Sequence, residues 1–309
     1  MKSAILTGGT GFIGSWLIEE LLAAEVDVTL IVRDKYRVLP KFIPSVEIIE
    51  SDTYNIPTSV FNRKRYDVFY HLGWGGVKPK EKNNVELQFG NIKNSIEAMQ
   101  LAKGLNCCKF IASGTVAEYV FSKDILDVNA KQTPNDMYGA SKVASHYFLD
   151  VLSKQIEQPF IWAVLPSTYG ERRNDDNIIT YTICSLLQGK KPIYGNLEQM
   201  WDFLYASDVA YALKRIGEDG IIGKTYGIGS NIYKPLKWYI MKIRDVIDPN
   251  LPLGIGEASN YSQQTLSSCV NAYELIKDTG FTPKVDFELG IKKTIKYFEE
   301  KIVKGIKIL

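Results

Sequence analysis

In the first half of the chain, short runs of apolar residues alternate with longer stretches in which apolar residues recur every three or four positions. Short apolar runs favour strands buried on both faces, whereas the wider spacing favours amphipathic helices. Because strands that alternate with helices build a sheet covered on both faces, the pattern predicts an α/β fold with a doubly wound parallel sheet. The predicted strands are 3–6, 28–32, 46–50, 67–72, 109–113 and 160–165.

Two of the helical stretches are long. In residues 85–99 the apolar positions follow the spacing of one helix face, and we expect this stripe to be mostly core. It consists of Val85, Phe89, Ile92, Ile96 and Met99. A second helix is predicted over 137–158. Its inward side chains are expected to be Val143, Ala144, Tyr147, Phe148, Val151 and Leu152.

A glycine cluster lies between the first predicted strand and the first helix. Gly9-x-Gly11-x-x-Gly14 fits the dinucleotide fingerprint, and the spacing from Gly8 fits the variant found in short-chain dehydrogenases. Such glycines allow a sharp turn, close approach of the backbone to a pyrophosphate, and tight packing of the helix on the strand. The helix N–H groups then point at the phosphates. The sequence therefore predicts a Rossmann sheet that binds a dinucleotide.

After Pro166 the alternation gives way to polar segments and glycine–proline turns, which indicates a second, smaller unit. A helix at 208–216 and a strand at 226–228 are nevertheless expected to return to the main sheet, so the units are interleaved. We predict a cofactor-binding domain of residues 1–165 with about 204–230. The smaller α/β substrate-binding domain is predicted to comprise residues 166–203 and 231–309.

Composition excludes several classes of partner. Of the 309 residues 45% are hydrophobic, and 37 basic against 35 acidic side chains leave a net charge of +2, too small to suggest a nucleic-acid or membrane-surface partner. No run of about 18 apolar residues predicts a membrane span. The chain begins with a strand rather than a signal peptide, so we expect a cytoplasmic protein. The four cysteines and two histidines lack zinc-site spacing, and neither a metal site nor a disulfide framework is expected.

Tyr138 and Lys142 lie four residues apart at the start of the second long helix, and hence on one face and one turn apart. A free tyrosine has a pKa of about 10, and acid–base work near neutrality needs a shift of roughly 3 units, which a neighbouring cation helps to supply. We expect Lys142 to be that cation. Ser113-Gly-Thr115 follows a strand, where ligands of open α/β sheets bind, and offers a hydroxyl to hold the reacting oxygen.

The residue that ends the second strand decides which dinucleotide is preferred. An acid at this point binds the ribose hydroxyls of NAD, whereas an arginine suits the 2′-phosphate of NADP. The strand ends at Val32-Arg33, with Lys35 and Arg37 nearby, while Asp34 favours NAD. We expect NADP (NADPH) as the cofactor, with NAD as the alternative.

In chain order, these motifs resemble the extended short-chain dehydrogenases that act on nucleotide sugars, over essentially the whole chain. The matching segments are Thr7–Gly14, His71-Leu72, Asn91, Ser113-x-Thr115 with Tyr119, Tyr138-x-x-x-Lys142, Tyr169-Gly170, Asp202-Phe203 with Asp208, and Gly280-Phe281-x-Pro283. The resemblance implies that Thr115 is the catalytic hydroxyl, Tyr138 the general acid and base, and Lys142 the residue that holds the tyrosine and the nicotinamide ribose. It also implies a cofactor site formed by Gly8, Gly11, Phe12, Ile13, Gly14, Arg33, Asp52, Leu72, Gly73, Tyr138, Lys142 and Pro166.

Three polar residues to which the resemblance points can also be explained by a structural role. Asp52 resembles the family's adenine-contacting aspartate, although an ordinary turn would use the same residue. Asn91 matches a structural asparagine of the family. His71 is a lone histidine at a strand end, and we expect a hydrogen-bonded core residue rather than an acid.

Several positions depart from that family's pattern. Relatives that dehydrate a hexose carry an Asp-Glu pair directly after the threonine. This chain has Val116 and Ala117 there, and Glu118 lies one position too far, so dehydration is not expected. Two arginines that hold the substrate diphosphate in 4-epimerases are replaced by Trp201 and Tyr261.

Substrate recognition must therefore use other residues. Pro166-Ser167 stands where relatives have an asparagine, and Arg172 and Arg173 are either replacement phosphate contacts or a solvated charge pair. The candidates for substrate binding are Trp74, Val116, Ser167, Arg172 and Trp201.

The resemblance implies an enzyme, and the layout is most similar to reductases such as the abequose synthase group. We expect an NADPH-dependent reductase of a 4-keto sugar on a nucleoside diphosphate, in polysaccharide or deoxysugar biosynthesis. The alternative is a 4-epimerase with tightly bound NAD. A small carbonyl reductase and a non-catalytic NADP-binding protein are further alternatives. Relatives pair through the two long helices, so we also expect a homodimer.

Overall fold

A seven-stranded sheet forms the centre of the protein, whose computed structural model describes residues 1–119, 125–173, 177–258 and 268–306. The strand order is β11-β6-β5-β4-β1-β2-β3, and every neighbouring pair is parallel. This confirms the predicted doubly wound parallel sheet. The strands are β1 Ser3–Thr7, β2 Asp27–Val32, β3 Val46–Glu50, β4 Val68–His71, β5 Lys109–Thr115, β6 Phe160–Leu165 and β11 Thr225–Gly227.

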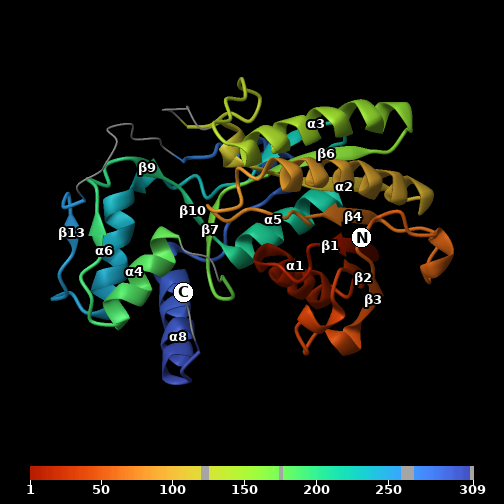
Figure 1. The fold of residues 1–309 in the computed structure, drawn as a ribbon. Helices are drawn as coiled ribbons and strands as arrows, with labels where there is room; N and C mark the ends of the chain where they lie inside the picture. Colours follow the sequence, from red (N-terminus) through yellow and green to blue (C-terminus); the bar gives the residue numbers. More distant parts are fainter. Residues whose placement is uncertain (120–124, 174–176, 259–267, 307–309) are drawn as a thin grey trace.

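Two pairs of helices cover the sheet, one pair on each face (Figure 1). One face packs against α1 (Phe12–Ala23) and α5 (Ala206–Asp219), and the other against α2 (Val85–Gly104) and α3 (Met137–Gln155). Short 3₁₀ turns connect several strands. They are η1 Lys35–Arg37, η2 Ile43–Ser45, η3 Thr58–Val60 and η4 Val116–Tyr119.

A third hydrophobic cluster belongs to the smaller unit, seen at the left of Figure 1 around α4, α6 and α8. These helices span Ile178–Leu187, Leu236–Ile247 and Phe287–Val303, and α7 spans Tyr273–Thr279. Short strand pairs accompany them. They are β7 Ser167–Tyr169 with β10 Phe203–Tyr205, β8 Ile193–Tyr194 with β13 Gly254–Ile255, and β9 Met200–Trp201 with β12 Lys234–Pro235.

The chain crosses between the two units more than once. After α4 it returns through α5 to β11, which pairs with β6 at the edge of the main sheet. The division into residues 1–165 with 204–230, and 166–203 with 231–309, stays a prediction. Among the described residues, no helix has the length and apolar character needed to cross a bilayer.

The faces predicted for α2 and α3 are wrong in part. Met99 is buried, but Val85 and Phe89 are exposed, and Tyr147, Phe148 and Val151 of α3 point away from the sheet. The inward positions carry small or polar residues instead, because the two helices pack closely against each other and against the sheet. On α3 these buried positions are Gly139, Ser141, Lys142, Ser145, Leu149 and Ser153.

The turn between β1 and α1 is as tight as the glycine motif requires. Gly8 has φ +75°, and a Cβ there would lie 2.7 Å from the backbone of Leu72. A Cβ on Gly14 would lie 2.2 Å from the carbonyl oxygen of Gly8. Since backbone atoms cannot give way as a flexible side chain can, only glycine fits at either position.

We predict that Gly14→Ala abolishes tight dinucleotide binding and lowers the free energy of unfolding by ~1–3 kcal/mol, because the added methyl pushes α1 off the loop. Calorimetric titration with NADPH and NADH, together with urea unfolding, measures both effects. Gly90→Ala in α2 is the matched control, since a Cβ there meets nothing within 4 Å. It should bind dinucleotide normally, and a Gly14→Ala protein that does the same would contradict the assignment of this loop.

Candidate active site

The ends of β4 and β5 and the first turn of α3 form the candidate active site. Strand β5 ends at Thr115, and α3 starts after Asp136, whose side chain accepts a hydrogen bond from the backbone N–H of Gly139 at 2.7 Å. This cap fixes the first turn of the helix. Tyr138 therefore lies at the start of α3 and Lys142 one turn later, as their spacing predicted.

Lys142 is buried, and its ammonium group is held by the end of β5. Nζ donates to the carbonyl oxygen of Ser113 at 2.6 Å and lies 3.4 Å from its hydroxyl. The same nitrogen lies 3.8 Å from the ring centre of Trp74, a cation–π contact. Burial lowers the pKa of Lys142, and the negative charge of Glu118 opposes that shift.

Tyr138 lies between Thr115 and Trp74. Its ring meets the ring of Trp74 edge to face at 6.3 Å. Burial raises the pKa of Tyr138 to about 12, and a hydrogen bond with the Thr115 side chain only partly counters this effect. The expected lowering of this pKa by Lys142 is not found, because the ammonium group is directed to Ser113 and Trp74.

The loop after β4 is fixed by side chains from α2. The Asn91 side chain accepts from the N–H of Gly75 at 3.0 Å and donates to its carbonyl oxygen at 2.9 Å. The Trp74 indole N–H donates to Gln88 at 3.0 Å. Asn91 is thus structural, as expected, and the loop places Leu72 and Gly73 beside the glycine turn.

His71 is a buried, hydrogen-bonded core residue, as predicted. Its ring nitrogens lie 3.0 Å from the Thr7 hydroxyl and 3.1 Å from the Ser95 hydroxyl. Burial lowers the pKa of His71 to about 3, so the ring is neutral at physiological pH. It joins β1, β4 and α2 and is not an acid of the site.

The N-terminus of α1 offers backbone donors to a phosphate group. Gly11 caps the helix without a side-chain hydrogen bond, and the first turn has no acidic residue. The guanidinium of Arg173 lies 5.4 Å from the Phe12 ring centre at this end, and its charge lowers the pKa of Tyr138. Arg173 also donates to the carbonyl oxygen of Thr168.

Arg172 lies on the side of α1 instead. It forms a salt bridge with Glu19 at 2.7 Å, donates to the carbonyl oxygen of Ser15 at 3.2 Å, and stacks on Trp16 at 4.2 Å. Of the two arginines, Arg173 is therefore the one directed toward Phe12 and Tyr138. Substrate binding by Arg172 stays a prediction.

The end of β2 carries the residues expected to select the dinucleotide. Arg33 is exposed, and within the described ranges its side chain takes part in no hydrogen bond or salt bridge. Asp34 accepts a hydrogen bond from the N–H of Tyr36 at 2.9 Å and so caps η1. Asp52 is exposed after β3. The side chain of Asp34, the residue that would favour NAD, is thus engaged in a hydrogen bond within its own turn.

The remaining predicted residues lie at the junction with the smaller unit. Pro166 is buried, and Ser167 lies 3.2 Å from the hydroxyl of Ser268. The indole of Trp201 packs against Phe203, and its buried Nε1 finds no hydrogen-bond partner among the described residues. Val116 is half-buried in η4. Tyr261, the second arginine replacement, lies outside the described residues.

Sequence reasoning missed two side chains that contact this site from beneath. Glu118 is fully buried, and its carboxylate accepts from the backbone N–H of Thr115 at 2.7 Å. The indole N–H of Trp162 on β6 donates to the same carboxylate at 3.3 Å. The signal in the sequence was an acidic residue, Glu118, in the apolar segment after Thr115.

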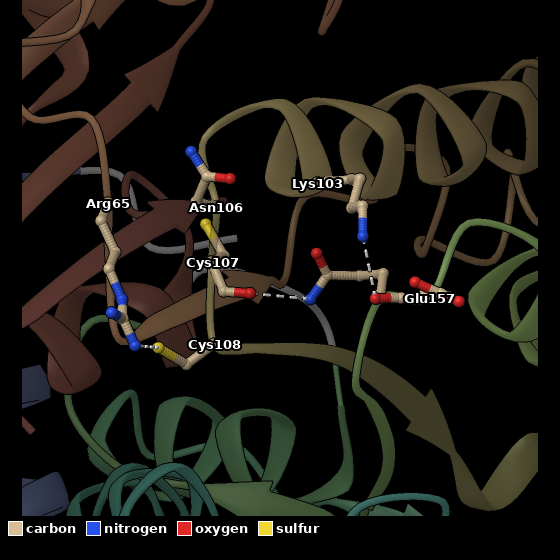
Figure 2. A pocket seen from close by; sticks show the side chains of 7 residues that line it. Arg65, Lys103, Asn106, Cys107, Cys108 and Glu157 are labelled. Carbon is tan, nitrogen blue, oxygen red and sulfur yellow. Dashed lines mark hydrogen bonds between the residues drawn. The ribbon is translucent and has the colours of Figure 1, made fainter.

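A hollow of about 420 Å³ lies near the amino ends of β4, β5 and β6, at the other end of these strands from the candidate active site (Figure 2). It opens beside Cys107 and Cys108, which precede β5. Arg65 donates to the Cys108 sulfur at 3.3 Å. In the described part of the chain no cysteine forms a disulfide, and no three side chains of the metal-ligating types form a cluster.

Comparison with known proteins agrees with this geometry. The profile of the NAD dependent epimerase/dehydratase family matches residues 4–229. A dTDP-glucose 4,6-dehydratase of Salmonella typhimurium is 25% identical over 95% of this chain and 92% of its own. Two solved structures share the fold. One is a dTDP-glucose 4,6-dehydratase from Bacillus anthracis in complex with NAD, with a TM-score of 0.83, 19% identity, and 99% of this chain and 100% of that chain covered. The other is a UDP-N-acetylglucosamine 4-epimerase from Methanobrevibacter ruminantium, with a TM-score of 0.83, 21% identity, and 97% and 99% covered.

The chain belongs to the NAD dependent epimerase/dehydratase family. This confirms the resemblance to nucleotide-sugar enzymes of the extended short-chain dehydrogenase type and the expectation of an NAD(P)-dependent enzyme.

The residues present fit a dinucleotide. The cradle formed by Gly8 and Gly14 is one that a Cβ would fill, and the uncapped N–H groups of α1 face outward from it. A pyrophosphate is the kind of group that such a turn binds. The individual cofactor contacts named from the sequence stay predictions.

We predict that Tyr138→Phe lowers turnover at least ~100-fold while cofactor affinity stays close to wild type, because only the proton-carrying hydroxyl is removed. Steady-state rates on a substrate that the wild type reduces, with NADPH titration alongside, measure both. Tyr147→Phe, an exposed tyrosine on the same helix, is the control and should be fully active. Undiminished turnover in Tyr138→Phe would show that the proton comes from elsewhere.

Proposed function

We propose that this protein is an NADPH-dependent reductase that converts the 4-keto group of a nucleotide-diphosphate sugar into a hydroxyl. The observation that carries the proposal is the grouping of Thr115, Tyr138 and Lys142 at one end of the sheet. Val116 and Ala117 stand beside them, where dehydrating relatives have an acid pair. A site with a proton donor but no such pair favours reduction.

Tyr138 is the proton donor in the proposed reaction. With a pKa of about 12 the phenol keeps its proton at neutral pH, which is the form that can protonate an alkoxide. A bound nicotinamide cofactor supplies the hydride that the carbonyl carbon accepts. Thr115 donates a hydrogen bond to the same oxygen as it becomes negative, and Lys142 adds positive charge behind it.

The substrate class is supported by similarity. The relatives of this chain bear the names of dTDP-glucose dehydratases, and solved structures with the same fold are a UDP-glucose 4-epimerase with UDP-glucose and a UDP-glucuronic acid 4-epimerase with NAD. We infer that this protein also takes a sugar on a nucleoside diphosphate. Arg173, directed toward Phe12 and Tyr138, is our candidate for a contact with the diphosphate.

A 4-epimerase is the second candidate, and the solved 4-epimerases of the same fold favour it. Such an enzyme needs the tyrosine both as base and as acid, and keeps NAD bound between the two steps. The exposed Arg33, which suits the 2′-phosphate of NADPH, favours the reductase. A cytoplasmic location follows from the same proposal.

The two candidates differ in their cofactor, which is the first measurement to make. We predict that the purified protein releases no tightly held NAD on denaturation, and that the stripped protein binds NADPH more tightly than NADH. Arg33→Ala should reduce NADPH affinity about tenfold or more and leave NADH affinity unchanged, because the guanidinium pairs with the 2′-phosphate.

Arg63→Ala is the matched control. Arg63 pairs with Asp27 at the amino end of the same strand, so its loss removes the same charge away from the cofactor. Retained NAD, with an affinity that Arg33→Ala does not change, would favour the epimerase.

We also propose that the protein is a homodimer that pairs through α2 and α3. The apolar side chains that these helices turn away from the sheet support it. Phe89 is 69% exposed and Phe148 56% exposed, and the two helices pack side by side. Val85, Tyr147 and Val151 on the same helices are also exposed. Exposed apolar side chains gathered on two adjacent helices are typical of an interface between subunits.

We predict that Phe89→Asp combined with Phe148→Asp converts a dimer into a monomer, because a carboxylate cannot be buried there without a partner. Light scattering after gel filtration at micromolar concentration measures the mass. Val303→Asp on α8, at a residue 87% exposed, is the control and should remain dimeric. A wild-type protein that is monomeric would contradict the proposal directly.

A further inference from the structure

Glu118 is a buried acid for which neither the family motif nor the proposed reaction has a use. It lies in η4, directly beneath Thr115, and none of its surface reaches solvent. Its carboxylate accepts three hydrogen bonds. Oε1 accepts from Thr115 N at 2.7 Å, and Oε2 from Trp162 Nε1 at 3.3 Å and Gln132 Nε2 at 3.2 Å. A buried carboxylate that accepts several hydrogen bonds is stabilised at its position, and the surrounding side chains are arranged to hold it there.

Glu118 and Lys142 hold neighbouring peptide units of the same strand. Lys142 donates to the carbonyl oxygen of Ser113, and Glu118 accepts from the N–H of Thr115. Only Gly114 separates these two atoms along the chain. The two charged side chains therefore fix the end of β5 from both sides, at the residue that carries the catalytic hydroxyl.

Gly114 makes room for the carboxylate. A Cβ at this position would lie 2.3 Å from Trp162 Nε1 and 2.6 Å from Glu118 Oε1. Trp162 Nε1 donates to Glu118 Oε2, and Glu118 Oε1 accepts from the N–H of Thr115, so neither side chain can withdraw without breaking a hydrogen bond. The glycine within Ser113-Gly-Thr115 is thus explained by Glu118 and not by its own backbone conformation.

The surroundings of Lys142 contain few groups that can balance its charge. Trp74 and Trp162 flank the ammonium, with Nζ 3.8 Å and 5.9 Å from the ring centres. The titratable groups around Glu118 are Lys142 and Tyr138 on α3 and Tyr119 on η4, and His146 on α3 joins through Gln132 and the Trp162 ring. His146 is neutral at physiological pH because burial lowers its pKa to about 4, and the two tyrosines keep their protons. His71 on β4 also lies near Lys142 and is neutral at physiological pH. Burial raises the pKa of Glu118, and the charge of Lys142 and the three donated hydrogen bonds oppose this shift. Among the described residues, Glu118 is therefore the acid that can balance the charge of Lys142.

We propose that Glu118 is a positioning residue of the catalytic centre, whose buried carboxylate holds the Thr115 peptide and supplies the negative charge that keeps the Lys142 ammonium in place. It touches neither substrate nor cofactor and acts through Lys142 and Thr115. The proposal rests on the proposed function only in taking those two residues as catalytic. The electrostatic part of it can be measured without any substrate.

The consequence of removing the charge can be derived from the signs of the interactions. Burial disfavours the charged form of Lys142, and Glu118 favours it. In Glu118→Gln the side chain keeps its size and one acceptor oxygen, but the opposing charge is lost. The pKa of Lys142 then falls, and Lys142 is charged only at lower pH.

The direct test is an NMR titration of lysine Cε signals in protein labelled with ¹³C-lysine, with Lys142→Arg used to assign the signal. We expect Glu118→Gln to move the Lys142 midpoint down by about one pH unit or more. Asp208→Asn is the matched control, since Asp208 is an equally buried carboxylate that accepts from the N–H groups of Lys284 and Val285, away from this site. Its variant should leave the Lys142 midpoint unchanged. An unchanged midpoint in Glu118→Gln overturns the proposal.

Turnover gives a second readout. In the reducing direction, Glu118→Gln should lose about tenfold or more in kcat at alkaline pH and recover toward wild type near pH 6, because acid restores the charge on Lys142. KM for NADPH should change less than kcat. An equal loss at every pH would indicate a merely structural role and overturn the electrostatic part. If the wild type reduces no 4-keto nucleotide sugar, the proposed function fails while the lysine titration still decides this inference.

The wild type alone also provides a test, should Glu118→Gln fail to fold. With ¹³C-labelled glutamate and lysine, Glu118 and Lys142 should titrate together, each signal reporting the other's ionisation. Independent titration, with Glu118 close to its ordinary pKa, would contradict the pairing.

Discussion

The buried ammonium group of Lys142 constrains the elements that surround the candidate active site. Burial of such a group costs several kcal/mol unless hydrogen bonds and an opposite charge surround it. Ser113, Trp74 and Glu118 provide these partners, and each comes from a different element. Strand β5, the loop after β4 and the turn η4 must therefore all meet at the first turns of α3. The same requirement explains why the inner side of α3 carries serines and a glycine rather than large apolar residues.

The sequence predicted the sheet and the placing of Tyr138 and Lys142 on one helix face well, because both depend on local patterns. A run such as Phe160–Leu165 defines its own strand, and the spacing of Tyr138 and Lys142 on a helix requires no knowledge of the rest of the fold. The glycine turn was equally clear, since its contacts lie within residues 8–14 and the neighbouring strand.

The faces of α2 and α3 and the ionisation of the site could not be predicted in this way. Phe148 and Val151 have the spacing of a buried stripe, but whether a stripe meets the sheet or another subunit depends on which helices pack together. The pKa of Tyr138 depends above all on how deeply its ring is buried, which only the folded chain shows. From the sequence, Glu118 could be described only as an acid one position away from the family's acid pair. The spacing of residues along a chain does not show where a side chain in a tight turn points.

The contact between Gly114, Glu118 and Trp162 has a consequence for how such a chain can change over time. A larger residue at position 114 collides with the carboxylate, and loss of the carboxylate leaves the indole N–H without its acceptor. Neither position can be exchanged alone without cost, so we expect the three residues to change together. We then expect substitutions that alter substrate choice to fall outside this trio, which keeps the end of β5 in one conformation.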